Sequence, residues 1–123
     1  MNTPKADVGC PMDRVLKLLM GPWTTYILWV LRSNGPTRFG ELKRRVPGIS
    51  ARMLTQRLRM LEQAGIVQRD YKPTIPPEVT YSLDERGHEL NAALTALNEV
   101  GMRWMQREQA ARPQSVDQQR GAA

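Results

Sequence analysis

The sequence predicts an α+β fold that is mainly α-helical, and three observations lead to this prediction. Short segments with apolar residues at three- and four-residue spacing are separated by Gly and Pro, as in a set of short helices. One of these helices, at about Ala51–Ala64, passes at Gly65 directly into two segments typical of a β-hairpin. A long segment with an apolar stripe, from Glu85 to about Glu108, follows. A helix that leads straight into a hairpin predicts a winged helix-turn-helix with a two-stranded wing.

Three helices are expected before this unit. The first covers Met12–Met20, where apolar residues keep helical spacing until a Gly-Pro pair ends it. The second, Trp23–Arg32, is apolar nearly all round, which indicates a buried central helix. After a short strand at Thr37–Phe39, a third helix is expected at about Gly40–Val46.

The helix at Ala51–Ala64 has two chemically different faces. Ser50 is expected to cap its start, because the hydroxyl can accept a hydrogen bond from a free backbone N–H. Gly65 is expected to close its end with a left-handed cap, in which Ile66 contacts Leu61. Helical spacing places leucines on one face and polar side chains on the other. The leucines are Leu54, Leu58 and Leu61, and the polar residues are Arg52, Thr55, Gln56, Arg59 and Gln63.

The wing is expected to pair Ile66–Lys72 with Val79–Leu83, and three prolines lie in the connection. Proline donates no ladder hydrogen bond, so these residues stiffen the tip and discourage pairing with other strands. Asp84 can then cap the last helix. Residues 10–109 are therefore expected to form the winged domain with its terminal helices, between a flexible segment, 1–9, and a polar, disordered tail, 110–123.

The positive charge of the chain is concentrated in one region. The net charge is +6; the segment Arg38–Arg69 holds eight basic and two acidic residues, and the remainder of the chain balances. A polyanionic partner such as double-stranded DNA accounts for this placement, and a solvated basic surface kept for solubility is the alternative. Because the charge coincides with the polar helix face and the hairpin, we predict that the protein binds DNA.

Other function classes find little support in the residues. With one cysteine no internal disulfide forms, and the longest unbroken apolar run, Tyr26–Leu31, is far too short to cross a membrane. No apolar segment of the kind found in a secretion signal follows the first residues, so a cytoplasmic protein is expected. His88 is the single histidine, and no phosphate-binding glycine loop or metal-ligand spacing occurs. We therefore expect that the protein is not an enzyme and that it binds neither a cofactor nor a metal.

The residues expected to contact DNA follow from their positions and their chemistry. Arg52 and Gln56 lie one helical turn apart and suit guanine O6 and N7 and adenine N6 and N7, respectively. Thr55 suits either a thymine methyl group or a phosphate, and Arg59 suits a phosphate. The predicted DNA-binding residues are Ser50, Arg52, Thr55, Gln56 and Arg59 on the helix, with Lys72 and Thr74 on the wing.

Several motifs are similar to those of the HxlR family of bacterial winged helix-turn-helix regulators, and they are specific only in combination. The matching stretches include Cys10-Pro11, Gly21-Pro22-Trp23, Gly35–Leu42, Gly48-Ile49-Ser50, Met53–Gln56, Ala64–Val67 and Pro76–Leu83, with Gly87 and Trp104 beyond them. The resemblance implies a homodimer that binds DNA, regulates transcription and dimerises through its first and last helices, here Met12–Met20 and Glu85–Glu108. Pro22 departs from the family, which usually carries a lysine before the tryptophan.

A two-fold dimer predicts a pseudo-palindromic operator with half-sites about 34–36 Å apart. The alternative is a winged-helix module that contacts another protein or RNA. The sequence reveals neither the operator nor the sign of regulation, and it leaves open whether a small-molecule effector binds.

Cys10 allows two interpretations. It is either an inert small thiol or a redox-sensing residue. Some members of the family sense oxidants or electrophiles with a cysteine at this N-terminal position, so the resemblance implies the second. Without another cysteine in the chain, oxidation has to join two subunits or add a small thiol.

Overall fold

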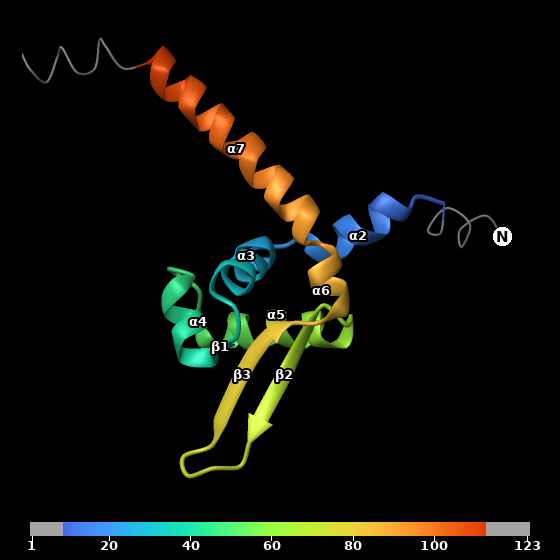
Figure 1. Ribbon diagram of the computed structural model, residues 1–123, viewed down its shortest axis with the longest axis vertical. Coiled ribbons are helices and arrows are strands. Elements are labelled where there is room, and N and C mark those ends of the chain that lie inside the picture. Colours follow the sequence, from blue (N-terminus) through green and yellow to red (C-terminus); the bar gives the residue numbers. More distant parts are fainter. Residues whose placement is uncertain (1–8, 113–123) are drawn as a thin grey trace, which may run out of the picture. The chain divides into compact units, whose positions relative to one another are not determined.

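The computed structural model describes residues 9–112, and the chain forms two units, one ending at Glu89 and one beginning at Leu90 (Figure 1). The elements of the first unit are α2 (Pro11–Leu19), α3 (Thr24–Asn34), β1 (Thr37–Arg38), α4 (Phe39–Arg45), α5 (Ala51–Gln63), β2 (Val67–Lys72), β3 (Glu78–Leu83) and α6 (Glu85–Glu89). The second unit contains α7 (Asn91–Ala111). This order confirms the mainly helical α+β fold and the winged helix-turn-helix. Most of the predicted flexible segment and tail lies outside the described residues.

The sheet is antiparallel and has three strands in the order β1-β3-β2. β2 and β3 pair along their whole length, from Val67 opposite Leu83 to Lys72 opposite Glu78. β1 adds a third strand, with Thr37 opposite Tyr81. The predicted hairpin is therefore present, and its base is widened by a two-residue strand that joins the sheet to α4.

The core of the first unit is built from the apolar faces of three helices and the base of the sheet. α5 contributes its three leucines, which are nearly fully buried, as predicted. The principal core residues are Ile27, Leu28, Leu31, Leu42, Val46, Leu54, Leu58, Leu61, Ile66, Val67 and Leu83. Burial of this set orients α5 so that its polar face remains exposed to solvent.

The end of α5 has the predicted left-handed cap. Gly65 has φ +77°, its N–H donates to the Glu62 carbonyl at 3.1 Å, and the Ile66 N–H donates to the Leu61 carbonyl at 2.9 Å. This pair of hydrogen bonds is a Schellman motif. It fixes where the helix stops and where β2 begins.

The connector, which we define as residues 20–23, lies next to Arg57 of α5 and next to Gly48, which precedes α5. Gly21 has φ +114°, and a Cβ at this position would lie 3.1 Å from Nη1 of Arg57 on α5. Trp23 is the N-cap of α3 with φ +75°, and its Cη2 would lie 3.4 Å from a Cβ on Gly48, just before α5. Arg57 therefore faces the connector rather than the polar face of α5.

The prediction of one continuous helix over Glu85–Glu108 is wrong, because α6 and α7 are separate helices. The Asp84 N–H donates to the Ile66 carbonyl at 2.8 Å, and a Cβ on Gly87 would lie only 2.3 Å from the same oxygen. These contacts hold α6 tightly against the start of β2. The interruption follows at Leu90, whose backbone remains in the helical region.

Candidate nucleic-acid interface

The start of α5 is built by Ser50. Its Oγ accepts a hydrogen bond from the Met53 N–H at 3.0 Å, which is the predicted N-cap. Because this bond uses a lone pair of the oxygen, the hydroxyl proton remains free to donate to a phosphate. Ser50 is exposed, so the cap and a phosphate contact are compatible.

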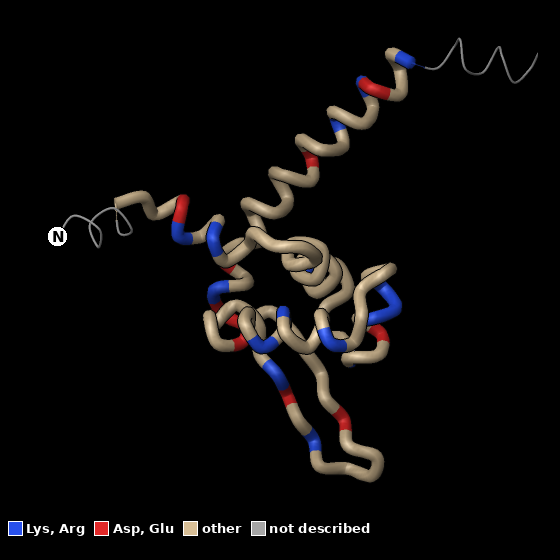
Figure 2. Tube along the Cα trace, turned by 180° about the vertical axis from the view of Figure 1, so that it is seen from behind, with Lys and Arg blue, Asp and Glu red and all other residues tan. Residues whose placement is uncertain are grey.

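The outer face of α5 presents three long polar side chains. Arg52, Gln56 and Arg59 are exposed, and none forms a hydrogen bond or ion pair with another residue of the described range. Figure 2 shows Lys and Arg recurring along α5 and along β2 of the hairpin. The donors of these side chains are therefore available to base edges and phosphates.

Thr55 differs from these three residues because its hydroxyl is already in use. Its Oγ1 donates to the carbonyl oxygen of Ala51 at 2.9 Å. A hydroxyl has one proton, so Thr55 has none left to donate to a phosphate while this bond lasts.

The two residues predicted on the wing also differ. Lys72 is exposed and stands opposite Glu78, whose carboxylate pairs with Arg38 at 3.1 Å. Thr74 donates its hydroxyl to the carbonyl oxygen of Pro76 at 2.8 Å, so it shapes the wing tip. A contact from Thr74 to phosphate would require this bond to break.

Sequence reasoning missed three exposed residues of the wing. The Arg69 guanidinium lies over the Tyr71 ring, 5.5 Å from its centroid, and Ile75 at the tip is fully exposed. The spacing of Arg69 and Tyr71, two residues apart on one strand, was a readable sign that they share a face. Ile75 carried no such sign, because loop exposure leaves no periodic pattern.

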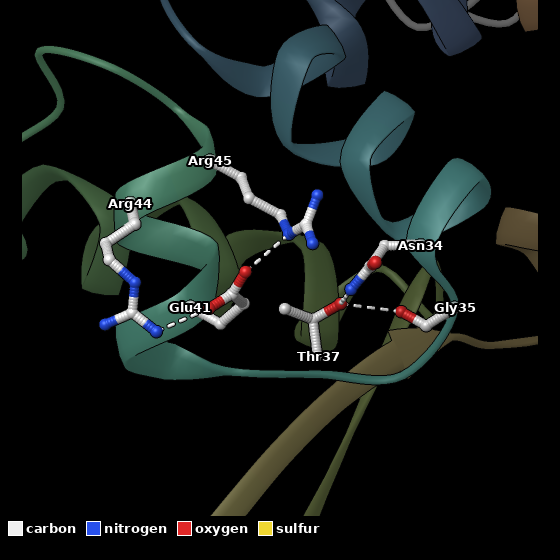
Figure 3. A network of polar contacts seen from close by, with 6 residues as sticks. All are labelled: Asn34, Gly35, Thr37, Glu41, Arg44 and Arg45. Carbon is white, nitrogen blue, oxygen red and sulfur yellow. Dashed lines mark hydrogen bonds and ion pairs between the residues drawn. The ribbon is translucent and has the colours of Figure 1, made fainter.

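A single carboxylate holds two of the basic residues of α4. Glu41 accepts hydrogen bonds from Arg44 and from Arg45 Nε, the latter at 2.7 Å (Figure 3). The hydrogen bond from Arg44, and then that from Arg45, lower the pKa of Glu41 below its usual range. The same figure shows Asn34 donating to Thr37 Oγ1, which in turn donates to the Gly35 carbonyl at the turn before β1.

These contacts divide the basic residues of the Arg38–Arg69 segment. Three of them form ion pairs within the protein: Arg38 with Glu78, and Arg44 and Arg45 with Glu41. Arg57 lies beside Gly21, and its Nε is buried without a hydrogen-bond partner in the described structure. The exposed basic residues without an ion pair in the described range are Lys43, Arg52, Arg59 and Arg69. The open charges on α5 and the wing include both arginines that sequence reasoning assigned to DNA on α5.

Cys10 is exposed and caps α2. Its Sγ accepts a hydrogen bond from the Asp13 N–H at 3.4 Å, as an N-cap side chain does. The sulfur is therefore both accessible and part of the first turn of a helix. Chemical modification of the sulfur would therefore act directly at the first turn of α2.

An open hollow of about 410 Å³ is lined by Trp29, Val30, Ser33, Asn34 and Arg45. It belongs to α3 and α4, and effector binding stays a prediction. Within residues 9–112, no group of three His, Cys, Asp or Glu side chains is placed to hold a metal ion. In the same range, no helix is long and apolar enough to cross a membrane.

The family model described as HxlR-like helix-turn-helix matches residues 18–109. The chain belongs to this family. It is 42% identical over 99 residues to sll1512, an HTH-type transcriptional regulator of Synechocystis sp., covering 80% of this chain and 73% of that protein. The HxlR-like chain is therefore a DNA-binding transcriptional regulator of the helix-turn-helix type, and its family and neighbours are regulators, not enzymes.

Two of the solved structures similar to this HxlR-like regulator are described by their redox state. The redox regulator HypR in its reduced form superposes with a TM-score of 0.72 at 36% identity, covering 76% of this chain and 91% of that one. Reduced YodB from B. subtilis superposes with a TM-score of 0.66 at 40% identity, and the match covers 73% of this chain and 88% of that one. HypR has also been solved in its oxidised form and YodB after diamide treatment.

Proposed function

We propose that this HxlR-like regulator binds a specific, pseudo-palindromic operator as a homodimer and responds to oxidants through Cys10. The observation that carries DNA recognition is the outer face of α5, where Arg52, Gln56 and Arg59 have no partner in the described part of the protein. In this fold the recognition helix enters the major groove and the wing touches the backbone or the minor groove. Arg52 and Gln56 would read bases, while Arg59, Ser50 and Lys72 would hold phosphates.

The proposed homodimer is supported by exposed apolar side chains on α2 and α7. On α2 and at its C-cap, four apolar residues are between 40% and 68% exposed, and on α7 four are between 50% and 60% exposed. These residues are Met12, Val15 and Leu16 on α2 with Met20 at its C-cap, and Leu97, Met102, Trp104 and Met105 on α7. Clustered large apolar side chains at the surface of a soluble protein mark association surfaces.

Light scattering after size exclusion at micromolar concentration tests the dimer. We expect the dimer mass for the wild type and a monomer for Trp104→Asp, which places a charge among apolar side chains. Ile75→Asp is the matched control, since it changes an exposed apolar residue on the wing and leaves both helices intact. Circular dichroism confirms that both variants are folded. A monomeric wild type would contradict the proposal.

Selection from a pool of promoter fragments, repeated at two salt concentrations, tests sequence-specific binding. We expect enrichment of one pseudo-palindromic site and an affinity that falls steeply with salt, because phosphate contacts release counterions. Salt-sensitive binding without enrichment would reduce the interface to a generic basic surface. Absence of duplex binding, with a protein or RNA partner recovered instead, would favour a winged module for protein or RNA contact.

The proposed redox response rests on the position of the thiol as well as on the redox states described for HypR and YodB. Cys10 is exposed, and its sulfur caps the first turn of α2, one of the two proposed dimer helices. Diamide would take two electrons and two protons from the Cys10 thiols of two subunits, giving one inter-subunit disulfide and the reduced hydrazine. The new bond would form at the capping sulfur and would therefore act on the start of α2.

Operator affinity measured with and without diamide tests this response. We expect diamide to change the affinity of the wild type and to produce a band of twice the subunit mass on a non-reducing gel, reversed by dithiothreitol. Cys10→Ser is the control, since serine keeps a capping oxygen and removes the thiol. An unchanged affinity, or the same change in Cys10→Ser, would refute Cys10 as the sensor.

The remaining functional assignments concern localisation, catalysis, cofactors and effectors. We propose that it works in the cytoplasm, where its DNA lies, with no catalytic activity of its own and no resident cofactor. His88, the single histidine, is exposed on α6. A thermal-shift screen of small molecules against wild type and Arg45→Ala tests whether the hollow beside α3 takes an effector.

A further inference from the structure

The first two turns of α5 carry two small side chains that each bear a methyl group, Ala51 and Thr55. Ala51 and Thr55 are four residues apart, so their side chains are neighbours on one face of the helix. Ala51 is exposed and Thr55 is partly exposed. They lie at the N-terminal end of the helix, beside Arg52 and Gln56, where a recognition helix meets base edges.

The hydrogen bond within this pair decides which chemistry Thr55 offers. Its hydroxyl proton is donated to the Ala51 carbonyl at 2.9 Å, and no other hydrogen bond of Thr55 occurs in the described chain. A phosphate oxygen needs a donor, and Thr55 has no second proton. What Thr55 still offers to an outside partner is its methyl group and an acceptor lone pair of Oγ1, but no donor.

One chemical feature of the major groove matches a pair of methyl groups. Thymine carries a C5 methyl group there, whereas the other bases present hydrogen-bond donors and acceptors. Removing a methyl-sized apolar group from water changes an equilibrium constant by about fourfold. A contact of this kind discriminates weakly by itself and adds to the readout by Arg52 and Gln56.

We propose that Ala51 and Thr55 together form an apolar contact that reads the 5-methyl group of a thymine in each half-site. This inference rests on the proposed function, since it presupposes binding to a specific duplex. It settles the two chemistries that the sequence left open for Thr55 in favour of the thymine methyl group. It also makes Thr55 a specificity residue rather than a phosphate contact.

Replacing each thymine of the selected operator by deoxyuridine tests the contact, because deoxyuridine pairs identically and lacks only the methyl group. Affinity is measured by fluorescence anisotropy for wild type, Thr55→Val and Thr55→Ser. Valine keeps the methyl group and removes the hydroxyl, whereas serine keeps the hydroxyl and removes the methyl group. We expect one symmetric pair of thymines at which deoxyuridine weakens wild type and Thr55→Val by about fourfold per half-site. Thr55→Ser should lose clearly less affinity than the wild type when deoxyuridine replaces the thymine, because only the Ala51 methyl group remains.

Each other outcome has a definite meaning. If no thymine of the operator is sensitive, or if Thr55→Val loses the sensitivity and Thr55→Ser retains it, the methyl contact is refuted while specific binding stands. If Thr55→Val lowers the affinity for operator and for random DNA by the same factor, Thr55 contacts phosphate and the inference is wrong. If no duplex is enriched at all, the proposed function fails and the methyl contact fails with it.

Discussion

Gly87 lies so close to the sheet that a single methyl group should displace α6. A Cβ at this position would stand 2.3 Å from the backbone oxygen of Ile66 and 3.0 Å from Cδ2 of Leu83. The side chain of Leu83 can shift, but the carbonyl also accepts the Asp84 N–H at 2.8 Å and is fixed by it. Gly87→Ala therefore forces α6 away from the start of β2 and weakens that hydrogen bond.

The expected loss of stability in Gly87→Ala combines three effects. Overpacking of a close contact costs about 1–3 kcal/mol. A weakened backbone hydrogen bond adds about 1 kcal/mol. The better helix propensity of alanine returns about 1 kcal/mol. We therefore expect the free energy of unfolding to fall by about 2 kcal/mol, which lowers the urea midpoint by about 1 M for a protein of this size.

Urea unfolding followed by circular dichroism at fixed protein concentration measures this change. Gly40→Ala is the matched control, since Gly40 is also helical and its Cβ would meet only Nη1 of Arg44, at an ordinary contact distance of 3.9 Å. We expect Gly40→Ala to be neutral or stabilising. A midpoint for Gly87→Ala equal to or above that of the wild type would show that α6 does not pack on β2 as described.

Three further variants test the charges of the interface. Arg52→Ala should cost about 1–3 kcal/mol of operator binding and relax the preference at one base pair, by anisotropy on single-base operator variants. Arg59→Ala should lower the affinity for operator and for random DNA by the same factor. It should also reduce the slope of log affinity against log salt concentration by about 1. Glu41→Gln should raise affinity for random DNA, because it releases Arg44 and Arg45. Since the folded-state pKa of Glu41 is lowered, its charge stabilises above the ordinary value of 4.5 and this contribution is lost as pH falls through the lowered pKa.

Each of these variants has a control measurement in urea unfolding. Arg52→Ala and Arg59→Ala should unfold in urea like the wild type, because both side chains are exposed and unpaired in the described structure. The difference in urea midpoint between wild type and Glu41→Gln should be present at pH 7 and vanish well below pH 4.5. Equal operator affinity for both arginine variants, or a Glu41→Gln difference that grows in acid, would contradict the assignments.

Local patterns predicted most of the helices and the wing, because their signals lie within a few residues. The leucine face of α5 and the cap at Gly65 follow from spacing and backbone freedom alone. The pairing of β1 with β3 could not be predicted, because two residues carry no period and tertiary contacts fix their register. The break at Leu90 was also hidden, since that residue keeps φ −78° and ψ −10° and neither Gly nor Pro marks it.

The DNA-binding residues were predicted from their helix face and their chemistry. The sequence does not show which of their polar atoms already form hydrogen bonds within the protein. The hydroxyls of Thr55 and Thr74 donate to backbone carbonyls of Ala51 and Pro76, partners that no side-chain pattern reveals. The fork of Glu41 to Arg44 and Arg45 was readable in principle, since three- and four-residue spacings bring charges together on a helix. Such internal contacts reduce the charge that a partner meets without changing the composition.

The connector between α2 and α3 links the N-terminal helix to residues in and just before α5, the helix proposed to contact DNA. It begins where α2 ends, and its Gly21 and Trp23 rest on Arg57 and Gly48, one within α5 and one just ahead of its cap. Close-packed groups of this kind transmit small displacements because no free volume absorbs them. We therefore expect a shift at the end of α2 to reach Arg57 of α5 before it reaches the sheet or the wing.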